Sequence, residues 1–171
     1  EALQANDSEA IRKAIWDAKP YQPDGIVDAK TLLKEVTTPQ KESDHDYPYE
    51  GLNKKLRGIR YGSLVTFTSG TGQGKSTITR EIAVHLLNKG ERVGFLDLEA
   101  SNRQTALGLM STAVGKALHI GEHSEKELKE HFSNTIANWN LYMFDGFGSF
   151  DPSVVYNRIE YLASGLECRI I

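Results

Sequence analysis

The sequence contains little cysteine, no long apolar run and no excess of positive charge. The one cysteine among 171 residues, Cys168, excludes an internal disulfide and an all-cysteine metal site, which suits a reducing compartment. The sequence has no run of roughly 18 apolar residues, and no basic segment followed by an apolar one at its start. It therefore predicts neither a membrane span nor a secretory signal.

The charge balance limits the range of partners. The formal net charge of −3 rules out an overall basic surface, so any contact with nucleic acid must come from a local group of basic side chains. The length, with 39% hydrophobic and 25% charged residues, is typical of one globular domain with an appendage. Because the chain begins with Glu1 and stops within an apolar run at Ile171, we expect it to be part of a longer sequence.

The first fifty residues contain two predicted helices. Residues 7–19 carry apolar side chains at helical spacing, and Pro20 ends this helix. Residues 29–36 form a second helix with Asp28 as its N-cap. A helix this short is marginal alone in water, so its apolar side needs a surface on which to dock. The polar stretch 37–50 is typical of a linker or loop.

From Gly51 onwards, strand and helix patterns alternate. The predicted strands are 63–68, 92–98, 141–144 and 167–171, and the predicted helices are 74–88, 101–118, 124–137 and 152–164. Ser124 is the predicted N-cap of its helix, and Pro152 lies near the start of the last one. This alternation is typical of an α/β fold with a parallel sheet flanked by helices. We expect three regions: a helical tail at 1–19, a linker with a docking helix at 20–50, and the α/β domain at 51–171.

A glycine-rich loop lies between the first strand and the first helix of this domain. Small residues let successive backbone N–H groups point at phosphate oxygens, and the following helix adds its dipole to the attraction. A Lys then reaches the β and γ phosphates, and a hydroxyl binds Mg²⁺. Lys75 and Ser76 supply these groups, whereas Ser69 replaces the glycine that usually opens the motif. The predicted nucleotide-binding residues are Ser69, Gly70, Thr71, Gly72, Gln73, Gly74, Lys75, Ser76 and Thr77.

Acidic residues at the ends of predicted strands are candidates for catalysis. Hydrolysis of ATP or a close relative needs a carboxylate that holds Mg²⁺ and usually another that orients or deprotonates the attacking water. In open α/β sheets such groups lie at the carboxyl ends of strands. Glu99 is the candidate base, with the alternative that it merely precedes the helix N-cap Ser101. We interpret Asp97 as structural, and Asp145 is a candidate Mg²⁺ ligand; spacing alone does not decide between it and an acid beyond Ile171.

Two further polar groups are interpreted as solvated surface. His119 and His123 stand four residues apart, but Gly121 interrupts the helix that a metal site would need, and His131 lies further on. A basic cluster precedes the first strand of the domain, and contact with phosphate or DNA is the alternative there. It consists of Lys54, Lys55, Arg57 and Arg60.

Taken together, three segments resemble one specific family. The loop region 62–77 and the two strand ends 94–99 and 141–145 are similar to the helicase half of phage replicative primase-helicases. That group includes the mitochondrial helicase Twinkle and is related to bacterial DnaB. The upstream segment 18–27 is similar to the connection between primase and helicase domains in the same group. The resemblance covers nearly the whole chain and is weakest at 110–138.

The resemblance implies a RecA-like P-loop NTPase core, incomplete at its C-terminus and preceded by a helical linker arm. It implies a homo-oligomeric ring, usually a hexamer, that hydrolyses ATP, dTTP or dATP with Mg²⁺ to travel 5′ to 3′ on single-stranded DNA. Lys75 and Ser76 would bind phosphate and Mg²⁺, and Glu99 would be the catalytic base. In this family the magnesium-side Asp follows the strand that starts at Cys168, so it would lie beyond Ile171 unless Asp145 takes its role.

The same resemblance implies roles for the segments before the α/β domain and a cellular compartment. The helix at 27–36 would be the arm that docks on the neighbouring subunit, and residues 1–19 would end a primase-type region. The compartment would be the cytoplasm of a bacterial or phage-infected cell, with the mitochondrial matrix as the alternative. We expect the chain as given to bind nucleotide weakly to moderately and not to unwind DNA.

Other functions remain open. A nucleotide or small-molecule kinase would need an arginine-rich lid, and no arginine cluster follows the second predicted strand. A non-catalytic RecA-like adaptor or loader would bind ATP only to assemble, and it need not keep Glu99 beside Lys75. A recombinase is a related alternative that the linker disfavours.

Overall fold

The computed structural model describes residues 27, 29, 32–39 and 42–171. The chain divides into two compact units, Glu1–Lys41 and Glu42–Ile171, and each is described by itself. In the first unit, helix α2 covers Leu32–Thr37 and overlaps the predicted docking helix. Its apolar side chains are open to solvent: Leu33 is 70% exposed and Val36 is 81% exposed. The predicted helix 7–19 and the predicted N-cap Asp28 lie outside the described residues.

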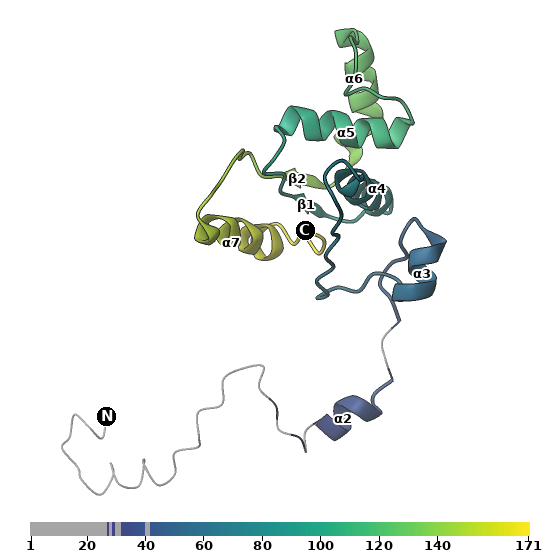
Figure 1. Ribbon diagram of the computed structural model, residues 1–171, viewed down its shortest axis with the longest axis vertical. Helices are drawn as coiled ribbons and strands as arrows, with labels where there is room; N and C mark the ends of the chain where they lie inside the picture. The colour runs from purple at the N-terminus through teal and green to yellow at the C-terminus, as the bar shows by residue number, and fades with distance from the viewer. Residues whose placement is uncertain (1–26, 28, 30–31, 40–41) are drawn as a thin grey trace, which may run out of the picture. The chain divides into compact units, whose positions relative to one another are not determined.

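The second unit is built around a small parallel sheet. Strand β1 covers Val93–Phe95, strand β2 covers Leu141–Met143, and the two pair in parallel (Figure 1). On its other edge β1 meets Ile170 in an isolated parallel bridge, where the N–H of Gly94 donates to the Ile170 carbonyl at 2.8 Å. The predicted α/β class with a parallel sheet flanked by helices is confirmed, although each strand is shorter than expected.

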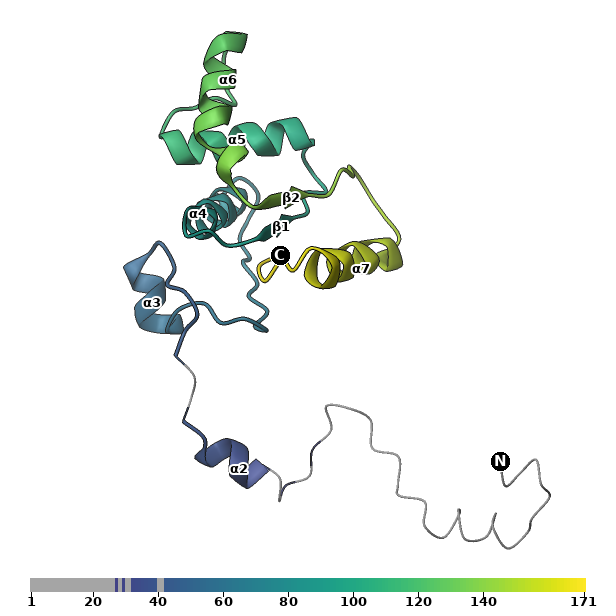
Figure 2. The same cartoon turned by 180° about the vertical axis from the view of Figure 1, so that it is seen from behind.

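Helices lie on both sides of this sheet. The helices of the second unit are α3 (Glu50–Leu56), α4 (Lys75–Asn88), α5 (Asn102–Val114), α6 (Glu125–Asn134) and α7 (Pro152–Glu160), with a 3₁₀ turn η1 (Ile136–Asn138) and a π turn η2 (Tyr161–Gly165). Figures 1 and 2 show α4 and α7 on opposite sides of the strands. Helix α5 packs on α4, and Leu162 of η2 approaches the backbone of Gly94 from the other side.

The helix ends follow from local sequence signals. The Ser101 side chain accepts from the N–H of Gln104, and the Gln104 side chain accepts from the N–H of Ser101, which forms a capping box at α5. Helix α5 ends before Gly115, which adopts φ 66°, so it is shorter than the predicted 101–118. Ser124 caps α6 as predicted, and Pro152 occupies the first turn of α7.

The hydrophobic core lies between α4, α5 and the sheet. Its buried members are Tyr47, Ile59, Ala83, Val84, Leu86, Leu87, Val93 and Leu109. Tyr47 belongs to the stretch 37–50 that the sequence predicts as linker or loop, and it is held by Asn53 of α3. The Asn53 amide accepts from the Tyr47 N–H at 2.7 Å and donates to the Tyr47 carbonyl at 2.9 Å. Residues 42–49 thus have an irregular backbone but belong to the second unit and contribute Tyr47 to its core. The sequence did not predict α3.

The strand predicted at 63–68 is wrong. Residues 63–70 have no regular secondary structure, and Leu64 is 94% exposed, while Phe67 packs on the core. A strand needs a partner for its backbone N–H and C=O groups. The segment 167–171, also predicted as a strand, forms only the bridge at Ile170, so it offers no ladder to which 63–68 could add. Among the residues that the structure describes, no helix is long and apolar enough to cross a membrane.

Candidate nucleotide-binding site

The glycine-rich loop leads directly into α4. Gly72 and Gly74 adopt φ values of 74° and 88°, which side chains with a Cβ rarely tolerate. Gly74 is the N-cap of α4, and its carbonyl accepts the N–H of Ile78 at 3.0 Å. The predicted sequence of tight loop followed at once by a helix is therefore present at these residues.

The N-terminus of α4 differs from those of the other long helices. An α-helix leaves its first N–H groups without partners inside the helix. Side chains of Ser101, Ser124 and Asp151 accept from these groups in α5, α6 and α7, but α4 has no side-chain cap. The first turn of α4 also carries no acidic residue. Its N–H groups and the positive end of its dipole are therefore available to an anion.

Lys75 lies across the loop. Its Nζ atom donates to the carbonyl oxygens of Ser69 at 3.0 Å and Gly70 at 3.1 Å. An ammonium group has three donors, so one N–H remains beyond these two bonds. The Lys75 ammonium group therefore lies against the backbone of the loop that leads into the uncapped start of α4. The arrangement fits a polyphosphate, whose oxygens need several donors and a nearby cation.

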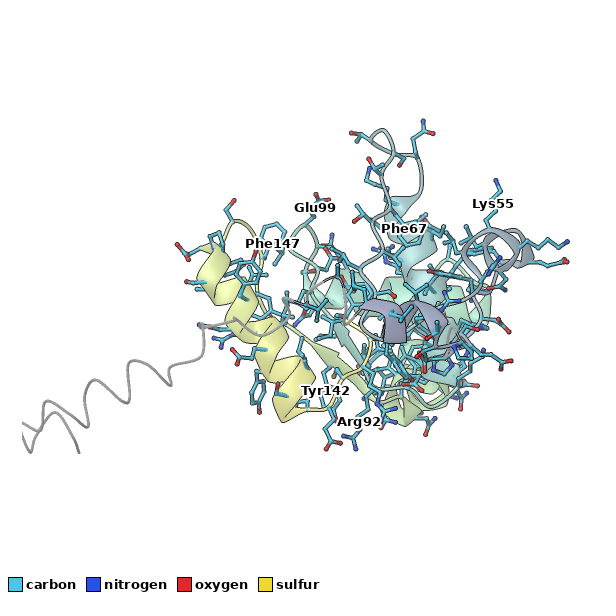
Figure 3. The ribbon with its side chains drawn as sticks, turned by 90° about the horizontal axis from the view of Figure 1, so that it is seen from below. Lys55, Phe67, Arg92, Glu99, Tyr142 and Phe147 are labelled. Atoms are coloured by element: carbon cyan, nitrogen blue, oxygen red, sulfur yellow. The ribbon has the colours of Figure 1, made fainter. Side chains whose placement is uncertain are left out.

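Glu99 and Asp145 lie beyond the carboxyl ends of β1 and β2. The N–H of Gly148 donates to the Leu98 carbonyl at 2.9 Å, so the two loops that follow the strands are in contact. Glu99 is exposed, and Figure 3 shows its side chain pointing away from the ribbon on the same side as Phe147. Asp145 accepts from the Asn102 amide at 3.1 Å. Both acids thus belong to one edge of the sheet, as expected for parallel strands.

Asp97 lies just before Glu99 and is enclosed by hydrogen bonds. Its Oδ1 atom accepts from the backbone N–H groups of Glu99 at 3.1 Å and Ala100 at 3.0 Å. Its Oδ2 atom accepts from the Thr105 hydroxyl at 2.8 Å. Because both oxygens are used within the protein, the interpretation of Asp97 as a structural residue agrees with its contacts.

A cavity of about 440 Å³ separates the irregular segment 59–67 from β1 and the end of the chain. Leu64, Val65, Phe67 and Ile171 give it apolar walls, and a polar side is formed by Ser76, Thr79, Arg80 and Asp97. The hydroxyl of Ser76 and the strand end at Asp97 thus border one space, which connects the start of α4 with the carboxyl edge of β1. The cavity runs along the edge of the sheet at Ile170, where no ladder with residues 63–67 is formed.

Of the three histidines singled out in the sequence, His119 and His123 lie between α5 and α6, and His131 lies within α6. Glu127 receives a hydrogen bond from Lys116, which holds the pKa of its carboxyl below the usual range. His123 lies 3.5 Å and His131 3.8 Å from the Glu127 carboxylate, and His119 contacts the Ser111 hydroxyl at 3.2 Å. Within the described part of the chain, no three or more His, Cys, Asp or Glu side chains are placed so that they could hold a metal ion.

Two contacts of the site were not predicted from the sequence. Asn102 binds Asp145, a residue far along the chain, and Thr105 binds Asp97 across the turn into α5. No spacing rule marks either residue. Thr105 is completely buried, with 0% of its surface exposed, and only the structure reveals this.

Comparison with known proteins gives a match over nearly the whole chain. The DNA helicase/primase of Enterobacteria phage T3 is 28% identical over 176 residues, which cover 96% of this chain and 31% of that protein. The resemblance to phage-type primase-helicases is confirmed. The chain spans about a third of the length of this helicase/primase, so it corresponds to one part of it. No protein-family model matches the chain.

Two shorter matches involve another class of protein. Cytosolic Fe-S cluster assembly factor NUBP2 of Bos taurus is 39% identical over 67 residues, and a NUBP2 homologue of Monosiga brevicollis is 39% identical over 51 residues. These matches cover 39% and 30% of the chain, and 24% and 18% of the respective relatives. They cover much less of the chain than the match to the phage helicase/primase, so they do not change the comparison with that protein.

Proposed function

We propose that the chain is part of a replicative DNA helicase that hydrolyses a nucleoside triphosphate to move 5′ to 3′ along single-stranded DNA. The subunits would form a homo-oligomeric ring of the hexameric type. The similarity to a DNA helicase/primase over 96% of the chain supports this proposal. It also supports a RecA-like core at 51–171, a linker at 20–50, and a primase-type tail at 1–19. The same similarity supports action in the cytoplasm of an infected host cell.

The observation that carries the proposal is the uncapped N-terminus of α4 together with the Lys75 ammonium group, which lies against the glycine-rich loop. Residues 69–77 would bind the phosphates of ATP, dTTP or dATP through backbone N–H groups, with Lys75 supplying the positive charge. The Ser76 hydroxyl would hold Mg²⁺, and Asp145 is a second candidate ligand. Mg²⁺ held at this position would neutralise charge on the phosphate oxygens.

Glu99 would act as the general base that takes a proton from the attacking water. Its carboxylate is exposed, and among the described residues it has no hydrogen-bond or ion-pair partner, so both oxygens are open to a water molecule. A positioned general base typically contributes about 10²- to 10⁴-fold to rate. The distance between Glu99 and the start of α4 would be spanned by the nucleotide and the water.

Nucleotide hydrolysis stimulated by single-stranded DNA tests the proposal, measured on the full-length protein that contains this sequence. Lys75→Ala and Glu99→Gln should each lower the stimulated kcat by about 100-fold or more. Glu99→Gln should still bind nucleotide within about threefold of the parent affinity, because the base does not hold the phosphates. Lys75→Ala should bind nucleotide much more weakly.

Other outcomes favour the other functions. Hydrolysis that is indifferent to DNA, together with transfer of phosphate to an added acceptor, would indicate a kinase. Nucleotide-dependent assembly without any hydrolysis would indicate an adaptor. A Glu99→Gln protein as fast as the parent would exclude Glu99 as the base and direct the search to Asp145.

A further inference from the structure

Asp97 holds the turn that carries Glu99 by hydrogen bonds to its backbone. Hydrogen bonds of 3.1 and 3.0 Å join its Oδ1 atom to the backbone N–H groups of Glu99 and Ala100. A carboxylate that accepts two adjacent backbone N–H groups fixes the path of the chain between them. The direction in which Glu99 leaves the backbone is therefore set by a neighbouring side chain.

Thr105 fixes Asp97 in turn. Its hydroxyl donates to Asp97 Oδ2 at 2.8 Å, and the side chain is fully buried in α5. The same helix is fastened at its start by the capping box of Ser101 and Gln104. Asp97, the turn 97–100 and the first two turns of α5 thus form one connected unit, because a buried hydroxyl can hold the carboxylate in only one place.

The Glu99 side chain itself receives no such support. It is exposed, and in the described part of the chain neither a hydrogen bond nor an ion pair restrains its carboxylate. A group that must meet a water molecule within hydrogen-bond distance depends on accurate placement, and an error of about 1 Å can cost about 100-fold in rate. The placement must therefore come from the backbone.

We infer that Asp97 and Thr105 are positioning residues for Glu99: they hold the turn from which the proposed base reaches the attacking water. This inference rests on the proposed role of Glu99 in nucleotide hydrolysis. Neither residue touches the nucleotide in this account. Their loss should slow the chemical step and leave nucleotide binding nearly unchanged.

Two pairs of variants of the full-length protein separate loss of the hydrogen bonds from loss of volume. Asp97→Ala removes every acceptor, whereas Asp97→Asn keeps one oxygen for the two N–H groups, and its amide can donate to the Thr105 hydroxyl. Thr105→Val removes the hydroxyl at nearly constant volume, and Thr105→Ser retains it. The measured quantities are kcat per nucleotide-binding site, KM for the nucleotide, and Tm.

Asp97→Ala should lower kcat by about 10- to 100-fold while KM stays within about threefold of the parent value. Asp97→Asn and Thr105→Ser should each stay within about threefold of the parent kcat, and Thr105→Val should lose about three- to tenfold. The double variant Asp97→Ala with Glu99→Gln should be no slower than Glu99→Gln alone, because no base remains to be positioned.

Three results overturn parts of the scheme in distinguishable ways. If Glu99→Gln is slow but Asp97→Ala retains the parent kcat per site, Asp97 is only structural and the proposed function stands. If the effects of Asp97→Ala and Glu99→Gln multiply in the double variant, Asp97 acts independently of Glu99. If Glu99→Gln matches the parent, the role of Glu99 fails first. Should Asp97→Ala not fold, equal kcat values for Thr105→Val and Thr105→Ser would reject the inference, and a slower Thr105→Val would support it.

Discussion

His85 joins two segments that are far apart in the sequence. Its Nε2 atom lies 2.9 Å from the Asp46 carbonyl oxygen, which can only accept, so Nε2 carries the proton of the neutral ring. Burial, and then the positive charge of Lys89, lower the pKa of His85 below its ordinary value of 6.5. The neutral form is therefore favoured in the folded protein.

This pKa shift predicts a loss of stability in acid. Between pH 6.5 and the lower folded pKa, the unfolded chain binds more protons at His85 than the folded chain. The contribution is complete above pH 6.5 and disappears as the pH falls through the folded pKa. His85→Gln, whose amide can still donate to Asp46, should therefore flatten the decrease of Tm between about pH 8 and about pH 5. His119→Gln is the control for removal of an exposed histidine, and parallel curves for parent and His85→Gln would contradict the prediction.

At the scale of elements, α4 and α5 pack through an arginine and a glycine. A Cβ atom added to Gly108 of α5 would lie 2.8 Å from Cζ and Nε of Arg80 on α4. The Arg80 Nε atom is buried, and among the described residues it has no hydrogen-bond partner. Gly108 therefore allows the flat guanidinium group to lie against α5, and the close approach depends on the missing side chain.

The substitution Gly108→Ala has two opposing effects on the free energy of unfolding, a gain in helix propensity and a loss from overpacking against Arg80. Alanine in a helix interior gains about 1 kcal/mol over glycine, and overpacking costs about 1–3 kcal/mol. In the parent chain, Gly108→Ala should therefore lower the free energy of unfolding or leave it unchanged. In an Arg80→Ala background, the same substitution should raise the free energy of unfolding by about 1 kcal/mol. Gly51→Ala in α3, where an added Cβ meets nothing within 4 Å, is the matched control in denaturant unfolding. Equal effects of Gly108→Ala in both backgrounds would show that Arg80 does not limit the packing.

The sequence predicted those elements whose signals are local. Caps at Ser101 and Ser124, the proline at the start of α7, and the glycines around α4 each act within one turn of chain, and the structure has them as expected. The strand at 63–68 failed because strand formation depends on a partner that local propensity cannot supply. Strands β1 and β2 lie where the sequence placed them but are shorter, since pairing covers only Val93–Phe95 and Leu141–Met143.

In the candidate site, too, local signals predicted some residues, whereas contacts between distant segments were not predicted. The loop at 69–77 is a contiguous motif, and Glu99 and Asp145 follow from the rule that functional acids end parallel strands. The contacts of Asp97 with Thr105 and of Asp145 with Asn102 depend on how α5 leaves the sheet. They became visible only when the helix start at Asn102 and its direction were known.

At the scale of the whole molecule, assembly is the property that one chain cannot display alone. Helix α2 belongs to the unit Glu1–Lys41, and its apolar side chains Leu33 and Val36 are 70% and 81% exposed. A six-residue helix is too short to be stable in water by itself. A docking role on a neighbouring subunit, which the proposed ring requires, would bury these side chains.

The double variant Leu33→Asp with Val36→Asp should therefore weaken ring assembly in the full-length protein. Full burial of one such side chain contributes about 1.5–3 kcal/mol, so the concentration for half-assembly should rise by about tenfold or more. Sedimentation velocity in the presence of nucleotide measures this concentration. Ile120→Asp, at a site that is 65% exposed in the second unit, controls for the added charge. Assembly equal to that of the parent would reject the docking role of α2 without touching the nucleotide site, because hydrolysis stimulated by single-stranded DNA reports on that site separately. Reduced assembly in both variants would instead indicate a general effect of charge on association.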